Sequence, residues 1–198
     1  MGGLTALATI LLAAMPAAAA AQQETPVKPA DPTAQIAELT EIYDSACLRA
    51  FPDDGAVARL MAARGATAMG DAEVRIYLHD DPGRGWVLDG RTVRAHVTLE
   101  APPFHACGVR ATTPATVADM APYIALAARF EAGGDWRSLG ARSMNVGNVH
   151  TSGAGERRQV REGSESLMVF FSTPSETNRD SARGAKEVRF VHQFSPQN

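Results

Sequence analysis

The clearest hydrophobic pattern in the chain predicts a helix over residues 34–50. Apolar side chains recur there every three or four positions, from Ile36 to Cys47, and this spacing places them on one face of a helix. Asp31 is suited to cap the N-terminal end, and Pro32 to the first helical turn, where its missing N–H costs nothing. Cys47 is therefore expected on or beside the buried face.

Two further helical regions follow from the same spacing. A short helix is expected after Asp53, with Val57 on its apolar side. The second region covers residues 113–131, and Pro122 lies inside it. Because proline interrupts a helix interior, we expect either a kink or a separate helix that begins near Ala121.

Alternation of apolar and polar residues predicts the strands. The Asp89–Gly90 pair lies between two apolar runs and indicates a hairpin turn, whereas the glycine-rich segment 151–155 is interpreted as the connection between two later strands. Expected strands cover residues 74–78, 86–88, 92–99 and 104–110 in the first half, and about 142–149, 156–161, 166–173 and 187–194 in the second.

Together these elements predict an α+β domain in which helices cover one face of a meandering antiparallel sheet. Residues 31–111 and 113–195 share the same order, a helix followed by several strands. This order raises the hypothesis that the two halves are an old duplication, although no repeated sequence supports it.

The N-terminal residues are typical of an export signal. Residues 4–14 form an uncharged apolar run, Pro16 interrupts it, and a string of alanines offers a cleavage site after Ala20 or Ala21. A membrane anchor is disfavoured because a spanning helix needs about 18 unbroken apolar residues. We therefore expect a bacterial protein, periplasmic or secreted, with a signal peptide over residues 1–21, a proline-rich tether over 22–33 and a single domain over 34–198.

The two cysteines take their meaning from this expected export. An oxidising compartment favours a disulfide between Cys47 and Cys107, the only thiols in the sequence. Two separate buried thiols are the alternative, and a redox-active pair is less favoured because there is no Cys-x-x-Cys motif. A bond across this separation of 60 positions would stabilise the fold by about 4 kcal/mol in the chain-entropy model.

The charge balance excludes some classes of partner. With 19 Lys and Arg against 22 Asp and Glu, the formal net charge is −3. This value argues against nucleic acid, whose partners need a basic face. It also gives no reason to expect binding to an anionic membrane, and no insertion into a membrane is expected after cleavage of the signal.

No motif in the sequence identifies a catalytic or metal site. His105 and Cys107 would share a strand face and suit zinc, but a disulfide removes that thiolate and no second cluster completes the ligand set. Signatures of nucleophilic catalysis and of phosphate-binding loops are also missing. We therefore predict no metal and no cofactor, and we interpret His192, which shares a face with aromatic residues, as a core histidine.

Candidate binding residues come from two places in the expected sheet. Arg157, Arg158 and Arg161 lie on one weakly apolar strand and could contact an anionic surface, although charges that guard an exposed edge strand are the commoner explanation. Arg84 and Trp86 follow a turn, where the tryptophan is either a core anchor or an exposed contact residue.

Three segments resemble a group of uncharacterised exported proteins of proteobacteria. They are Ala46–Asp53 (ACLRAFPD), Gly85–Trp86 and Pro102–Arg110 (PPFHACGVR), and the resemblance covers about residues 40–112. What it implies is a secreted, disulfide-bonded domain. It brings no activity and no catalytic residues.

The sequence thus favours a non-enzymatic binding or accessory protein of the cell envelope, whose expected partner is another envelope protein. A small envelope hydrolase with a site assembled from dispersed residues is the alternative. A deep pocket in which His79, His96 or His105 meets carboxylates would favour the enzyme. A flat or grooved surface with exposed arginines or aromatic residues would favour the binding protein.

Overall fold

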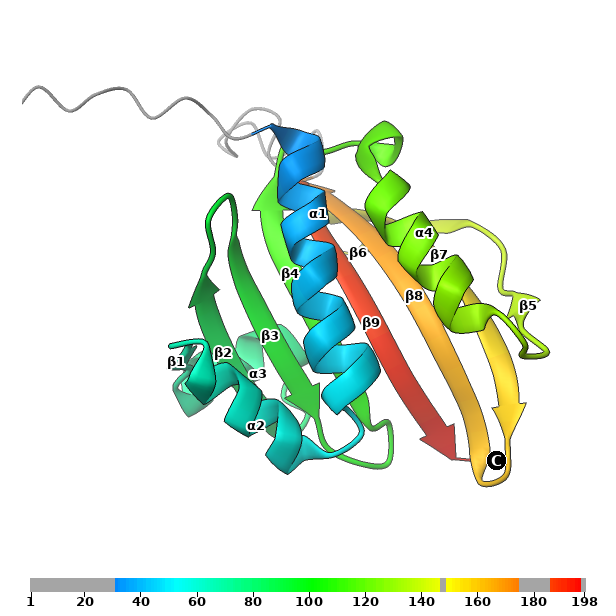
Figure 1. Ribbon diagram of the computed structural model, residues 1–198, viewed down its shortest axis with the longest axis horizontal. Helices are drawn as coiled ribbons and strands as arrows, with labels where there is room; N and C mark the ends of the chain where they lie inside the picture. Colours follow the sequence, from blue (N-terminus) through cyan, green and yellow to red (C-terminus); the bar gives the residue numbers. More distant parts are fainter. Residues whose placement is uncertain (1–30, 147–148, 175–185, 197–198) are drawn as a thin grey trace, which may run out of the picture.

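The computed structural model describes residues 31–146, 149–174 and 186–196 and shows an α+β fold, which confirms the predicted class. The described strands form one antiparallel sheet in the order β1-β2-β3-β4-β9-β8-β7-β5, and β6 also pairs with β7 (Figure 1). The strands are β1 (Thr67–Ala68), β2 (Gly83–Asp89), β3 (Arg94–Glu100), β4 (Ala106–Thr113), β5 (Arg137–Ser138), β6 (Arg142–Val146), β7 (Val149–Val160), β8 (Gly163–Pro174) and β9 (Lys186–Pro196). The helical segments are α1 (Pro32–Tyr43), η1 (Asp44–Ala50), α2 (Asp54–Ala63), α3 (Asp71–Leu78), η2 (Val117–Asp119) and α4 (Ala121–Glu131).

The predicted signal peptide over residues 1–21 lies outside the described residues, as does most of the predicted tether over 22–33. Among the helices that the structure describes, none has the length and apolarity needed to cross a bilayer.

α1 has the N-terminal cap that the sequence predicted. The carboxylate of Asp31 accepts a hydrogen bond from the Thr33 N–H at 3.3 Å, and Pro32 lies in the first turn. After Tyr43 the chain continues as a π-helical stretch, η1, which carries Cys47 against β4. The helix predicted over 34–50 is thus one helical segment in two parts.

α1 and α4 cover one face of the sheet, which we call the helical face (Figure 1). Aromatic rings from both helices and from β9 meet there: the ring centroid of Phe190 lies 4.3 Å from that of Tyr123 and 5.5 Å from that of Tyr43. All three side chains are buried. α4 begins at Ala121 with Pro122 in its first turn, which confirms the separate helix expected there.

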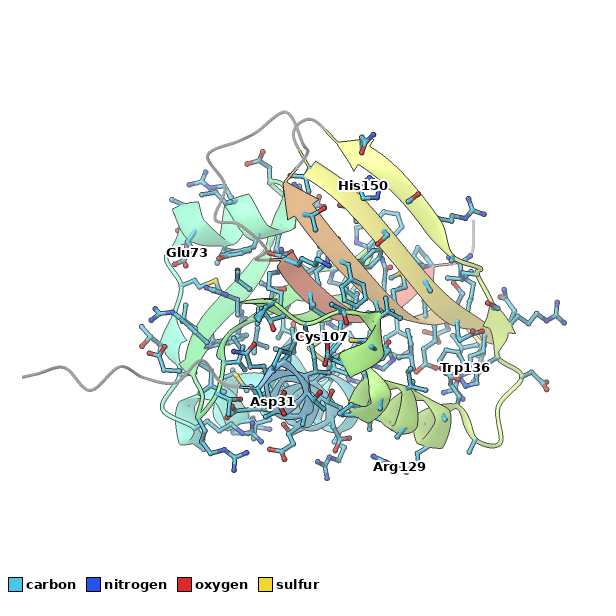
Figure 2. The ribbon with its side chains drawn as sticks, turned by 90° about the horizontal axis from the view of Figure 1, so that it is seen from above. Asp31, Glu73, Cys107, Arg129, Trp136 and His150 are labelled. Atoms are coloured by element: carbon cyan, nitrogen blue, oxygen red, sulfur yellow. A yellow bond between two sulfur atoms is a disulfide. The ribbon has the colours of Figure 1, made fainter. Side chains whose placement is uncertain are left out.

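α3 lies against the opposite face of the sheet, which we call the second face (Figure 2). The prediction of a strand at 74–78 is wrong, because these residues form most of α3. Val74 and Leu78 are four positions apart and are buried with Met69, whereas Ile76 between them is 74% exposed. A strand would have placed all three on one side, and helical geometry separates Ile76 from the other two.

β7 runs unbroken through the glycine-rich segment, so the predicted connection at 151–155 is wrong. Its antiparallel partner β6 ends at Val146, which is paired with Val149 at the start of β7. Gly153 lies within this strand, at a position where a side chain would not fit: a Cβ would lie 2.6 Å from Cδ1 of the Phe170 ring. Glycine in this strand therefore marks close packing and not a turn.

The two halves of the sheet meet at β4 and β9, the last strand of each half. Each half begins with a helix on the helical face, α1 or α4, and ends in antiparallel strands, as predicted. In the first half, however, α3 lies between β1 and β2. In the register between the two central strands, Arg110 lies directly opposite Arg189.

Candidate binding pocket on the second face of the sheet

The second face of the sheet has a hollow of about 300 Å³ beside α3. The end of α3 forms one wall, and β8 forms another through Met168 and Phe170. The floor is made by β3, β4 and β9. Two small residues of β4, Ala106 and Gly108, leave room above this floor.

Two arginines, Arg110 of β4 and Arg189 of β9, line this hollow, which we therefore call the arginine pocket. Arg110 is only 6% exposed. Its Nη2 donates to the Tyr77 carbonyl at 3.1 Å, and its guanidinium carbon lies 4.8 Å from the centre of the Tyr77 ring. Glu187 Oε1 is 3.6 Å from Nη1. The Nε–H of Arg110 has no acceptor among the described residues.

Arg189 has fewer partners than Arg110. Its guanidinium carbon lies 4.7 Å from the centre of the Phe170 ring, in a cation–π contact. Its Nε–H is buried and lacks an acceptor within the described part of the chain. None of the ion pairs between described residues includes Arg189. Both arginines line the pocket, and each has a buried Nε–H without an acceptor among the described residues.

The charges of the two arginines destabilise each other and are poorly solvated. They lie directly opposite on paired strands, where like charges repel. Burial lowers the pKa of Arg110 to about 10, with the attraction of Glu187 opposing it, and burial also lowers the pKa of Arg189. Arg110 is still protonated at pH 7. Burial thus disfavours both positive charges, and Glu187 and Glu100 offset this effect only in part. A bound anion would stabilise the two charges further.

Acidic groups lie at the α3 side of the arginine pocket. Asp81 and Glu100 both line it, and burial together with the charge of Asp81 raises the pKa of Glu100. The backbones of His79 and Asp80 are left-handed, with φ of 55° and 70°, a conformation that is uncommon outside glycine. These two residues end α3 and lead the chain to Asp81, so this turn sets the shape of the wall.

The three arginines predicted as one contact surface lie in different places. Arg157 and Arg158 are neighbours in β7 and so point to opposite faces: Arg157 bonds Ser166 on the second face, and Arg158 bonds Glu165 on the helical face at 2.6 Å. Arg161 is exposed just beyond β7. The explanation as a guarded edge strand does not fit Arg157, because β5 pairs with the outer side of β7 at this residue.

The other residues singled out from the sequence also lie outside the arginine pocket, with one exception. Trp86 is 8% exposed in the main core, as expected of a core anchor, and Arg84 is exposed on β2. His79 lines the arginine pocket. His105 instead contacts Asp54, with 2.8 Å between Nε2 and Oδ1. Within the described ranges, no three His, Cys, Asp or Glu side chains are grouped to hold a metal ion.

The predicted disulfide between Cys47 and Cys107 is present. The residue paired with Cys107 on β9 is His192, whose Nδ1 donates to the Cys47 carbonyl at 2.6 Å and whose Nε2 lies 2.7 Å from Glu165. His192 is thus the satisfied core histidine that the sequence predicted. Cys47 is thus attached to both central strands, to Cys107 of β4 and to His192 of β9. Each of these two residues lies three positions along its strand from Arg110 or Arg189.

Sequence reasoning did not select Arg110 or Arg189. Each is a single charge in an otherwise apolar strand segment, GVRA in β4 and VRFV in β9. That pattern is a usable signal, because a charged residue is rarely buried in a sheet without a partner.

Comparison with known proteins adds no family to this description. The chain matches no protein-family model, no curated protein and no solved structure. The fold and the site define an α+β domain with a pocket on one face of its sheet, lined by two arginines and by the acidic residues Asp81 and Glu100.

Proposed function

We propose that the protein is a non-enzymatic binding module of the cell envelope that holds a small anionic ligand in the arginine pocket. The observation that carries this proposal is the Arg110–Arg189 pair: a buried and a half-buried arginine that lie directly opposite, each with an Nε–H that has no acceptor among the described residues. A bound carboxylate or phosphate would accept these donors and offset the repulsion between the two charges. The volume of about 300 Å³ suits a small ligand or the head of a larger one.

Titration calorimetry with inorganic phosphate and with acetate tests this proposal. We expect at least one of these anions to bind, and Arg189→Gln to weaken that binding about tenfold because a charge-assisted contact is lost. Arg129→Gln is the matched control, because Arg129 is an exposed arginine of α4 on the helical face (Figure 2). No binding of either anion, or equal binding by Arg189→Gln, would refute the proposal.

The proposed location is the periplasm or the exterior of a bacterium. Residues 1–21 and the resemblance to exported proteobacterial proteins support it, and the Cys47–Cys107 disulfide is compatible with an oxidising compartment. N-terminal sequencing of exported protein should begin near Ala21 or Gln22, and retention of Met1 would contradict the signal. Association with another envelope protein stays a prediction, which a pull-down from envelope extract would test.

A small envelope hydrolase is the second candidate, and a contact in a separate hollow favours it. His105 Nε2 lies 2.8 Å from Asp54 Oδ1, and His105 lines a hollow of about 430 Å³ together with Ser164 and Ser195. A histidine oriented by a carboxylate is suited to act as a general base. Hydrolysis of p-nitrophenyl acetate that is lost in His105→Ala would favour the hydrolase, and equal rates in the two proteins would contradict it.

A further inference from the structure

A second hollow adjoins the arginine pocket on the same face of the sheet. It has a volume of about 380 Å³ and is formed by β6, β7 and β8 with the segment after β5. Leu139 and Met144 line it, and Met168 and Phe170 line both hollows. The two hollows therefore meet at Met168 and Phe170. We call the second one the apolar groove.

Two glycines keep the apolar groove open. Gly153 and Gly155 of β7 both line it. A Cβ on Gly153 would lie 2.6 Å from Cδ1 of Phe170, and a Cβ on Gly155 would lie 2.9 Å from Cγ of Met168. Side chains at these positions would therefore displace the two residues at which the hollows meet.

Apolar side chains are left uncovered along this groove. Met144 of β6 is 58% exposed, and Met168 and Phe170 are half-buried. α3 lies over the β2–β3 end of the second face, and no described helix lies over the β6–β8 end (Figure 2). Exposed apolar side chains beside a charged pocket match a ligand that combines both properties.

We propose that the ligand is a single-chain amphiphile, with an acidic head in the arginine pocket and an apolar chain along the apolar groove. This inference rests on the proposed function, because the same arginine pair binds the head. Phe170 connects the two parts: Arg189 stacks on its ring, and the ring also lines the groove. A carboxylate head matches the donor geometry of the guanidinium groups, and a hydrocarbon chain matches the mostly apolar lining of the groove, which also includes Arg142 and Arg157.

The burial of the arginines favours a slender ligand over a protein surface. Arg110 is 6% exposed and lines the hollow, so a head group must enter the hollow to reach its guanidinium group. A carboxylate at the end of a flexible chain can enter a hollow of about 300 Å³. A broad protein surface would stay outside it, in contact with the rim alone.

Titration calorimetry with three probes tests this inference. Decanoate, below its micelle concentration, has both the head and the chain, acetate has the head alone, and octyl glucoside has a chain with an uncharged head. We expect decanoate to bind about 100-fold more tightly than acetate, because each buried methylene adds to the affinity. Octyl glucoside should bind more weakly than decanoate, because it cannot accept the arginine donors as an anion does.

Two substitutions separate the contribution of the head from that of the chain. Arg189→Gln should weaken decanoate and acetate alike, by about tenfold. Met144→Asp should weaken decanoate by about tenfold and leave acetate unchanged, because it places a charge beside the chain and not beside the head. Ile124→Asp is the matched control: Ile124 is 59% exposed on α4, on the helical face, and this variant should bind both acids as the wild type does.

Each outcome bears on a different part of the argument. Equal affinities for decanoate and acetate, or decanoate binding that Met144→Asp leaves unchanged, overturn the amphiphile and leave the anion site standing. Binding of neither acid overturns the amphiphile, and it overturns the proposed function as well if inorganic phosphate also fails to bind. Decanoate binding that persists in Arg189→Gln overturns the amphiphile, because the ligand would then be held without the arginine pair. It overturns the proposed function too if acetate and phosphate binding also persist in that variant.

Discussion

Replacing Arg110 by methionine tests whether the arginine pair serves binding or holds the fold. Methionine keeps a long unbranched side chain and removes the charge at a position that is 6% exposed. If the pair is present for a ligand, its charge destabilises the fold without that ligand. Removal of one charge should then change the free energy of unfolding very little.

The expected change follows from the contacts of Arg110. Burial, opposed by Glu187, lowers its pKa from 12.5 to about 10. This shift corresponds to about 3 kcal/mol against the charged form, present in full at every pH below about 10. Methionine removes that penalty but loses the bond to the Tyr77 carbonyl, worth about 1.5–3 kcal/mol, and the contact with the Tyr77 ring, worth about 1 kcal/mol. The gain and the losses balance to within about 1 kcal/mol.

Urea unfolding followed by tryptophan fluorescence measures this change. Arg158→Met is the matched control, because Arg158 bonds Glu165, a carboxylate whose side chain is 3% exposed, at 2.6 Å. That variant should lose about 2 kcal/mol of stability, because the buried Glu165 carboxylate loses one of its two basic hydrogen-bond partners and keeps the other, His192. A loss of about 3 kcal/mol or more in Arg110→Met would refute the reasoning and give Arg110 a structural role. Anion binding by Arg110→Met should fall about tenfold.

Three further predictions concern the rest of the fold. Replacing Cys47 and Cys107 together by alanine removes a cross-link over 60 residues and should lower the free energy of unfolding by about 4 kcal/mol; urea unfolding should give reduced wild type a similar loss. Glu38 accepts two backbone N–H bonds from the β2–β3 turn, at 2.7 and 2.6 Å, so Glu38→Gln should lose about 2 kcal/mol at pH 7 by the same assay. Burial raises the pKa of Glu165, but hydrogen bonds from two basic side chains outweigh burial and leave the pKa below 4.5. The stability that Glu165 contributes is complete above pH 4.5 and is lost as the pH falls through its folded pKa, so Glu165→Gln and wild type should converge at low pH. A constant difference between them from neutral to acid pH would contradict this.

Local signals in the sequence were enough where neighbours along the chain decide the structure. The cap at Asp31 is one case, because its partner is the N–H of Thr33. The β2–β3 hairpin is another: Asp89 is paired with Arg94 across the predicted turn. The disulfide was predictable for a simpler reason, since the chain has only two cysteines.

The prediction for the short segment 74–78 failed because its apolar positions fit the period of a strand and the period of a helix equally well. Val74, Ile76 and Leu78 alternate as in a strand, and Val74 and Leu78 are also one helical turn apart. The eight residues of α3 are too few for the pattern to separate these readings. Packing against the sheet decides, by burying two of the three side chains and leaving Ile76 in solvent.

The arginine pocket could not be predicted, because it depends on the pairing of distant strands. Arg110 and Arg189 are 79 positions apart (189 − 110) and become neighbours only in the register of β4 with β9. The predicted arginine surface on β7 failed for the opposite reason: residues close in sequence were expected to lie together in the structure. Arg157 and Arg158 are adjacent in sequence, and for that reason a strand sends them to opposite faces.

The contacts of Cys47 on the helical face explain how the arginine pair keeps its place on the second face. Cys47 is bonded through sulfur to Cys107 of β4, and its carbonyl accepts a hydrogen bond from His192 of β9. Cys107 and His192 are themselves paired across the two strands, three positions from the arginines. Because a slip of one residue reverses every side chain of a strand, this attachment also fixes the face that Arg110 and Arg189 occupy. The disulfide therefore helps to keep Arg110 and Arg189 in the arginine pocket, although it lies on the other face of the sheet.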